Sequence, residues 1–481
     1  MAETQNNKPL LNRKEWQTMM PAITATAAGA YVIGSTSSNR RYSLLMSSST
    51  VHYLYDHHGD DWIPINSGAL GGTFGAGSCG IQTAWSINYT ATGGSTTTVT
   101  VLATTHNLDN NVVGDTIEFL TGTAGNIGLR RVITAIKTNA GIGTITLTLD
   151  VAVPSPVANS DTFRISSGSF FVFNAGTLSA TSFKRYDVAS GTWTALSVTG
   201  LPASWGTDGR MVRPYARDES FDSGTATSGS TTTLTCTGKG WTDDQWINYQ
   251  VRITAGTGVG QKSRITDSTT DTLTFAAGAT IDNTSEFVIE GDENALYLLG
   301  NNAVTMYKYS ISGNSWTTVA PTVARAGAAI AGMQADWIGK TGDTQWADIT
   351  NIQDGRYIYS LRGGTAVMDR FNISGGTAGV GAWEVVAYTP NQQTFALGAS
   401  SGWSAPYIIY AKEGTAAIPQ RFYKYDVAGN AMFPLTTDWY LGGAAVIGNK
   451  IWVKNLSSEG KIKWLYCLQS TSTNLRRIML F

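Results

Sequence analysis

The sequence has few charged residues and no excess of either sign. Only 14% of its 481 residues are charged, and 33 Lys and Arg against 34 Asp and Glu give a formal net charge of -1. A general electrostatic field that gathers nucleic acid or an anionic membrane is therefore excluded. We expect neither nucleic acid nor membrane among its partners.

Cysteines and long apolar runs are also scarce. The three cysteines, Cys79, Cys236 and Cys467, are widely spaced and odd in number, which argues against a disulfide framework or a zinc knuckle. The first residues, MAETQNNKPLLNRKEW, contain no apolar core like that of a secretory leader, and no segment approaches the roughly 20 apolar residues of a membrane span. These absences predict a soluble protein made in the cytoplasm.

Glycine, aromatic residues and Ser/Thr tracts are abundant instead. The chain contains 53 Gly, 15 Trp and 20 Tyr. β-Branched and aromatic runs separated by glycine turns are typical of all-β proteins.

One short pattern recurs along the chain: an aromatic residue, a polar and an aliphatic residue, a turn-rich loop, then Trp or another large apolar residue. The copies are YLYDHHGDDWIPI from Tyr53, YDVASGTWTAL from Tyr186, YSISGNSWTTV from Tyr309, FNISGGTAGVGAWEVV from Phe371 and YDVAGNAMFPL from Tyr425. Each predicts a β-hairpin whose aromatic residue and Trp share one buried face. We expect Trp193, Trp316 and Trp383 to pack between repeats.

Further strands precede most of these hairpins, at Glu293–Asn302, Gly355–Gly364, Ala405–Gly414 and Asn449–Asn455, so one unit holds three or four strands in about 50 residues. With the C-terminal hairpin there are six candidate units. Repeated small sheets of this period are typical of β-propellers. The pattern resembles the kelch family, whose blades carry a double glycine before the Tyr and Trp; Gly442–Gly443 fit it well and Gly71–Gly72 less well. The resemblance implies an all-β, kelch-like β-propeller of about six blades, within a range of five to seven.

Closure of the propeller ring is expected from the two ends of the chain. The first plausible strand, Ala30–Gly34, is predicted to pair with the last one, Thr473–Leu480.

Two stretches that interrupt the repeat resemble each other. TATGGSTTTVTV from Thr90 matches TATSGSTTTLTC from Thr225, TGTAGNIGLRRVIT from Thr121 matches TAGTGVGQKSRIT from Thr254, and DTFRISSG from Asp161 matches SEFVIEG from Ser285. Their period-2 runs predict two copies of a small barrel or sandwich. The predicted organisation is an N-terminal arm (1–20), a propeller (21–88, 169–222 and 292–481) and two inserted β-modules (89–168 and 223–291).

The second insert carries a more specific pattern, GWTDDQWINYQVRITAGTGVGQKSRI, from Gly240 to Ile265. Both inserts resemble a module that recurs in structural proteins of tailed bacteriophages, and the second shows the resemblance more clearly. The GTGVG segment inside it precedes a strand and not a helix, so we expect a hairpin turn and not a phosphate-binding loop.

Candidate metal ligands gather in one turn. His57, His58 and Asp60 lie together in YDHHGDDW, but adjacent side chains diverge in a turn, and a solvated loop is favoured over a metal site. We expect no catalytic residues, no cofactor and no metal.

Two sets of residues are candidates for interaction. Arg210, Arg213 and Arg217 form a basic stretch that is expected to be a surface salt-bridge patch or, alternatively, to dock onto acidic residues of a neighbouring subunit. The aromatic residues of the second insert, expected to be exposed, are Trp241, Trp246 and Tyr249.

These features favour a non-enzymatic structural protein of a bacteriophage virion, located in the tail, neck or baseplate and assembled in the host cytoplasm. Its partners would be other virion proteins and copies of itself, with the inserts making the subunit contacts. One alternative is an adhesion protein whose exposed aromatic residues bind a host surface glycan. A second alternative is an enzyme of the kelch or sialidase-like propeller type.

Overall fold

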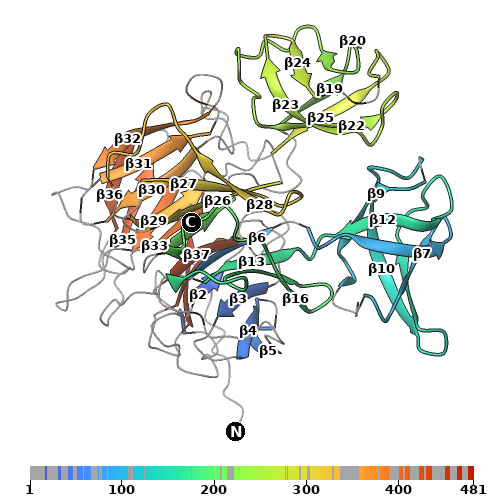
Figure 1. Ribbon diagram of the computed structural model, residues 1–481, viewed down its shortest axis with the longest axis horizontal. Helices are drawn as coiled ribbons and strands as arrows, with labels where there is room; N and C mark the ends of the chain where they lie inside the picture. The colour runs from blue at the N-terminus through green and yellow to red at the C-terminus, as the bar shows by residue number, and fades with distance from the viewer. Residues whose placement is uncertain are drawn as a thin grey trace.

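The computed structural model describes residues 17–18, 31–33, 42–46, 51–66, 74–335, 357–388, 400–411, 422–435, 450–455, 463–468 and 475–480, with short gaps inside the longer ranges. The regular elements of these residues are β-strands, coloured along the chain in Figure 1. Among the same residues, no helix has the length and hydrophobicity needed to cross a membrane.

Most strands belong to six four-stranded antiparallel sheets, numbered here as blades along the chain. Blade 1 contains β2 (Tyr31–Ile33), β3 (Tyr42–Met46), β4 (Val51–Asp56) and β5 (Asp61–Asn66). Blade 2 contains β6 (Cys79–Thr83), β13 (Ser169–Phe173), β15 (Phe183–Asp187) and β16 (Thr192–Ala195). Blade 3 contains β18 (Gly209–Val212), β26 (Ala295–Gly300), β27 (Met306–Ser310) and β28 (Ser315–Val319).

The remaining three blades follow in chain order. Blade 4 contains β29 (Ile330–Ala335), β30 (Tyr357–Arg362), β31 (Val367–Asn372) and β32 (Ala382–Tyr388). Blade 5 contains β33 (Ser400–Ser404), β34 (Tyr407–Ala411), β35 (Phe422–Asp426) and β36 (Ala431–Pro434). Blade 6 contains β37 (Lys450–Asn455), β38 (Lys463–Leu468), β39 (Leu475–Leu480) and β1 (Gln17–Thr18). A short two-stranded sheet pairs β14 (Gly176–Thr177) with β17 (Ser204–Trp205).

The first strands of the blades form a closed ring. Each lies at one edge of its sheet, and they contact one another in the cyclic order β2, β6, β18, β29, β33, β37 and back to β2. A ring of small antiparallel sheets that meet at their inner edges is a β-propeller. The predicted all-β propeller is therefore confirmed. The double glycines of the kelch pattern, Gly71–Gly72 and Gly442–Gly443, lie outside the described residues.

The ring is closed by the two ends of the chain, but the strand predicted to do so is wrong. Gln17 and Thr18 of β1 pair with Arg477 and Arg476 of β39. The segment Ala30–Gly34 instead contributes β2, the innermost strand of blade 1, which pairs with β3. Because β2 is taken up by blade 1, the free edge of β39 pairs with the preceding strand, β1.

The recurring hairpins place an aromatic pair directly across two strands. Tyr186 is opposite Trp193, and Tyr309 is opposite Trp316, with ring centroids 5.0 and 4.9 Å apart. Trp316 also lies 5.0 Å from the ring of Phe183 in blade 2, so it packs between two blades as predicted. Such contacts contribute about 0.5–1.5 kcal/mol each beyond the buried area.

In the hairpins of blades 1, 3 and 5 the turn is held by a tyrosine at the same position. Its hydroxyl donates to an Asn or Asp five residues later, and that residue adopts a left-handed backbone, which Asn and Asp tolerate better than most residues. The pairs are Tyr55 with Asp60 (φ 51°), Tyr309 with Asn314 (2.7 Å, φ 45°) and Tyr425 with Asn430 (2.9 Å, φ 46°). The repeat therefore specifies the turn as well as the core.

A closed barrel lies in the chain between β6 and β13 of blade 2. Its strands are β7 (Tyr89–Gly94), β8 (Thr98–Leu102), β9 (Thr116–Thr121), β10 (Arg130–Asn139), β11 (Thr144–Leu149) and β12 (Asn159–Ile165), in the order β10-β11-β8-β7-β12-β9. It is referred to below as the β7–β12 barrel.

A seven-stranded sheet lies in the chain between β18 and β26 of blade 3. Its strands are β19 (Asp222–Thr225), β20 (Ser228–Gly229), β21 (Thr233–Thr235), β22 (Gln250–Ala255), β23 (Lys262–Ser268), β24 (Thr272–Phe275) and β25 (Glu286–Glu290). The order β19-β25-β22-β23-β24-β21-β20 equals that of the barrel if β19 and β20 together correspond to β7. This β19–β25 sheet and the barrel share a strand order, in line with their matching sequences.

Candidate functional site

The barrel and the β19–β25 sheet meet backbone to backbone at two corresponding glycines. Gly128 lies in the β9–β10 loop and Gly260 in the β22–β23 loop, each two residues before the first basic residue of the next strand. A Cβ on Gly128 would lie 2.6 Å from the Cα of Gly260, and a Cβ on Gly260 would lie 2.7 Å from the carbonyl oxygen of Ile127. Both glycines also have positive φ, 78° and 85°. This contact therefore leaves no room for a side chain at either position.

Two buried carboxylates lie beside this contact, one from each unit. Arg164 donates through Nε and Nη2 to Oε2 of Glu118, at 2.8 and 2.6 Å. Arg252 donates in the same way to Oε1 of Glu290, at 3.0 and 2.6 Å. Arg130 of the barrel joins the two pairs, because its Nη2 lies 3.6 Å from Oε1 of Glu118 and 3.7 Å from Oε1 of Glu290. The charge network thus spans both units.

Trp85, in the connection between β6 and β7, covers part of this network. Its ring lies 4.2 Å from the guanidinium carbon of Arg164 and 5.2 Å from that of Arg130. A guanidinium over an indole face is attracted by the ring electrons. The indole therefore helps to hold both arginines next to the carboxylates.

Asp187, in the hairpin that begins at Tyr186, attaches the barrel to blade 2. Its Oδ1 accepts the hydroxyl of Tyr89 at 2.6 Å, and its Oδ2 accepts the backbone N–H of Ile87 at 2.9 Å. The hydroxyls of Ser169 and Ser190 also donate to it, at 3.1 and 2.9 Å. Burial and the neighbouring Asp187 carboxylate raise the pKa of the Tyr89 hydroxyl. That hydroxyl therefore stays protonated and keeps donating.

A cavity of about 840 Å³ opens where these elements converge. Its walls come from the β6–β7 connection, the barrel, blades 2 and 3, the end of β18 and the β22–β23 hairpin. The charged side chains that line it are Glu118, Arg164, Arg185, Arg213, Arg252 and Lys262. This cavity is the candidate functional site, because side chains from four separate parts of the chain converge on it.

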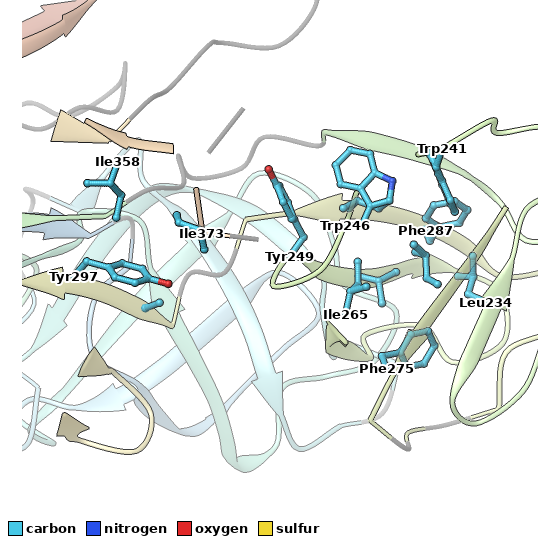
Figure 2. Packing of buried hydrophobic residues seen from close by; sticks show 14 of the residues in the cluster. Leu234, Trp241, Trp246, Tyr249, Ile265, Phe275, Phe287, Tyr297, Ile358 and Ile373 are labelled. Atoms are coloured by element: carbon cyan, nitrogen blue, oxygen red, sulfur yellow. The ribbon is translucent and has the colours of Figure 1, made fainter. Parts of the chain in front are cut away.

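The aromatic residues predicted to be exposed for ligand binding are buried, so that expectation is wrong. Trp241 and Trp246 are each 6% exposed and Tyr249 is fully buried. Trp241 donates its Nε1–H to Asp222 at 2.7 Å, and the rings of Trp246 and Tyr249 meet edge to face at 5.2 Å. Figure 2 shows them inside the hydrophobic cluster of the β19–β25 sheet. Bulky rings in a small unit are needed for its core, which leaves none of these three faces for stacking on a sugar.

The basic stretch is not a surface patch, and that expectation is also wrong for the described residues. Arg210 and Arg213 are 4% and 5% exposed. Arg210 lies in β18, the innermost strand of blade 3, where neighbouring blades contact each other. Arg213 follows that strand and lines the cavity. Arg217 lies outside the described residues.

The candidate metal ligands point into separate contacts. His57 is buried, its Nε2 lies 2.7 Å from Oγ of Ser43, and its ring packs edge-on against Tyr55 and Tyr466. Asp60 accepts the Tyr55 hydroxyl. His58 lies outside the described residues, and no group of three potential ligands that could hold a metal occurs among those described. The GTGVG segment is a hairpin turn as predicted, since β22 and β23 pair antiparallel on either side of it.

Sequence reasoning missed the charge network and the cavity. Arg130 of the barrel matches Lys262 of the β19–β25 sheet. In the strand pairing, Arg130 lies opposite Glu118. At the matching place in the sheet, Lys262 lies opposite Arg252. Glu118 and Arg252 thus carry opposite charges at matching positions, and this difference could have predicted a contact between the two inserts. Nothing in the sequence indicated that blade residues such as Arg185 face the same cavity.

Comparison with known proteins adds little to this picture. No protein-family model and no curated protein sequence matches the chain. Among solved structures it is similar to U3-55K (8% identity, TM-score 0.35, covering 95% of this chain and 100% of that one), to the WD40 repeats of RRP9 (8%, 0.35, 97% and 100%) and to YCF48 bound to D1 peptide (8%, 0.36, 98% and 97%). TM-scores this low carry no argument, so the propeller assignment rests on strand topology.

Proposed function

We propose that the protein is a non-enzymatic structural component of a tailed-bacteriophage virion, in the tail, neck or baseplate. The propeller is the scaffold, and the two inserts make contacts with other subunits. We also propose that the propeller is of the kelch type and that the inserts (89–168 and 223–291) are separate domains.

The contact between the two inserts carries this proposal. They leave adjacent blades and are locked to each other by the Gly128–Gly260 contact and by the Arg130–Glu290 ion pair. Two units fixed in this way present one composite surface to a partner and lose little conformational entropy on binding. The bacteriophage assignment is supported by the resemblance of Gly240–Ile265 to virion modules.

Self-association is the first property to test, by light scattering and negative-stain imaging of the full chain. Ile142, at the β10–β11 hairpin of the barrel, is 69% exposed, and Val323, which follows blade 3, is 53% exposed. We expect rings or fibres that Ile142→Asp disrupts and the matched control Val323→Asp leaves intact. A monomer at every concentration would overturn the assembly role, and equal disruption by both variants would contradict a subunit contact through the barrel.

The place in the particle requires a separate test. An antiserum against the purified protein is expected to label the tail, neck or baseplate of intact virions of the phage that encodes it. Absence of label from those particles would contradict the virion assignment, whatever the oligomeric state in solution.

A further inference from the structure

The described lining of the cavity between the inserts and the propeller is rich in cations. Among the described residues that line it, five are cationic, Arg164, Arg185, Arg213, Arg252 and Lys262, and one is a carboxylate, Glu118. Glu290 and Arg130 complete the adjoining network and leave the same excess of positive charge. Clefts lined by charges of one sign attract ligands of the opposite charge.

The carboxylates of the network are already engaged. Glu118 is bound by Arg164, and Glu290 by Arg252, with the Nζ of Lys262 3.7 Å from its second oxygen. The Asp187 carboxylate, close to Arg185, accepts hydrogen bonds from Tyr89, Ile87, Ser169 and Ser190. The described hydrogen bonds to Asp187 therefore come from groups other than Arg185.

Arg185 of blade 2 is the cation of the lining that supports a ligand site most directly. Its Nε is buried and has no hydrogen-bond partner among the described residues, although its guanidinium lies 6.0 Å from the ring of Phe171. Burial lowers the pKa of Arg185, an effect opposed by the charge of Asp187. An arginine nevertheless keeps its proton in proteins. A buried donor of a permanent cation is costly to leave unpaired, and an anion in the cavity would relieve that cost.

The remaining lining favours a small ligand. Asn88, Asn294 and Ser312 offer neutral hydrogen-bonding groups around the cations. The volume of about 840 Å³ falls in the range of small-molecule sites. Guanidinium groups bind the planar or tetrahedral oxygens of carboxylates and phosphates through paired hydrogen bonds.

We infer that this cavity binds a small ligand that carries several carboxylate or phosphate groups. The site is formed jointly by the barrel, the β19–β25 sheet and blades 2 and 3. A bound ligand would hold the two inserts against the propeller, because the side chains that contact it would come from both inserts and from the propeller.

Calorimetric titration of the full chain with citrate and with pyrophosphate, at low ionic strength, tests the site. Binding of at least one probe is expected, with affinity falling as salt is added. Lys262→Gln and Arg185→Gln should each weaken binding by about tenfold or more, because each removes one charge-assisted interaction. Citrate alone would identify carboxylate as the ligand group, pyrophosphate alone would identify phosphate, and either result supports the site.

Arg370→Gln is the matched control. Arg370 pairs with Glu384 in blade 4 and does not line the cavity, so the control should bind both probes as the unaltered protein does. The Lys262 side chain is 25% exposed, which keeps the test valid if Arg185→Gln fails to fold. Failure of both probes to bind, or unchanged affinity in Lys262→Gln, would overturn the inference. Because the readout is binding and not assembly, this outcome is independent of the proposed virion role.

Discussion

The barrel and the β19–β25 sheet share a strand order but are attached to the propeller in different ways. The barrel has its own hydrophobic cluster, and among the described residues the propeller contributes Ala189 to it. Hydrogen bonds to Asp187 attach the barrel to blade 2. The sheet shares one cluster with blades 3 and 4, in which Trp246 and Tyr249 continue into Tyr297, Ile358 and Ile373 (Figure 2). The difference shows that one local fold can keep a hydrophobic core of its own or join a larger one, depending on which side chains line its base.

Excision is expected to give the largest difference between the two units. Each insert leaves and re-enters the propeller between two paired strands: Thr83 pairs with Ser169 in blade 2, and Val212 pairs with Tyr297 in blade 3. Because the strand ends on either side of each insert are adjacent, an Asn-Gly turn can replace the insert. Removing residues 84–168 should leave a soluble propeller, whereas removing residues 214–295 should give aggregated protein because apolar side chains of blades 3 and 4 lose their cover. Soluble yield and size-exclusion profiles measure this; equal behaviour of the two deletions would refute the distinction.

Corresponding core residues provide a finer test. Phe163 and Phe287 occupy equivalent positions, opposite Phe119 and Ile253, and both are buried. Replacing either with alanine should cost about 3–5 kcal/mol. Phe163→Ala should lower a separate barrel transition in scanning calorimetry, whereas Phe287→Ala should lower the transition of the propeller as well. If both substitutions move the same transition, the cores are not independent.

Acid should weaken the propeller through His52. This histidine is buried against Phe74 and Trp193, and burial, with a smaller contribution from the charge of Lys184, lowers its pKa from 6.5 to about 4. The unfolded chain then binds the additional proton between pH 6.5 and about 4, so stability is full above this window and falls as the pH falls through it. The loss amounts to at most about 3 kcal/mol.

The control for this effect is His52→Gln, which should flatten the dependence of the unfolding free energy on pH between 6.5 and 4. In the barrel, the pKa of His106 is also lowered by burial, but Asp187 opposes the shift. Denaturant titrations at several pH values should therefore show a greater loss for the propeller than for the barrel. Identical pH profiles for the variant and the unaltered chain would contradict the assignment to His52.

The smallest expected effect concerns the tether of the barrel. Tyr89→Phe removes the hydroxyl that donates to Asp187 while keeping the ring, which stacks on Phe163 at 5.6 Å. A loss of about 1–2 kcal/mol is expected, because a buried carboxylate oxygen loses a donor. Hydrogen exchange should increase in β7 and not in the blades. Unchanged protection of β7 would mean that the hydroxyl does not hold the barrel.

Much of the propeller was predictable from residues a few positions apart. The pairs Tyr186–Trp193 and Tyr309–Trp316, the glycine and asparagine turns, and the strands before them follow from two-residue alternation and turn chemistry. The closing strand was misplaced because Gln17–Thr18 is too short to show any alternation. The exposure of Trp241 and Trp246 was misjudged because a tryptophan beside polar residues has the same local pattern at a surface and in the core of a small unit.

The sequence by itself determined the repeated hairpin, the all-β class and the likeness of the two inserts, because each depends on local periodicity. Only the tertiary structure decided that Gly128 meets Gly260, that Arg130 bridges Glu118 and Glu290, and that Arg185 and Arg213 face the same cavity. These residues are far apart in the sequence, since those that line the cavity extend from Thr83 to Ser312. Their proximity follows from the order of blades in a closed ring, which places the bases of the two inserts side by side.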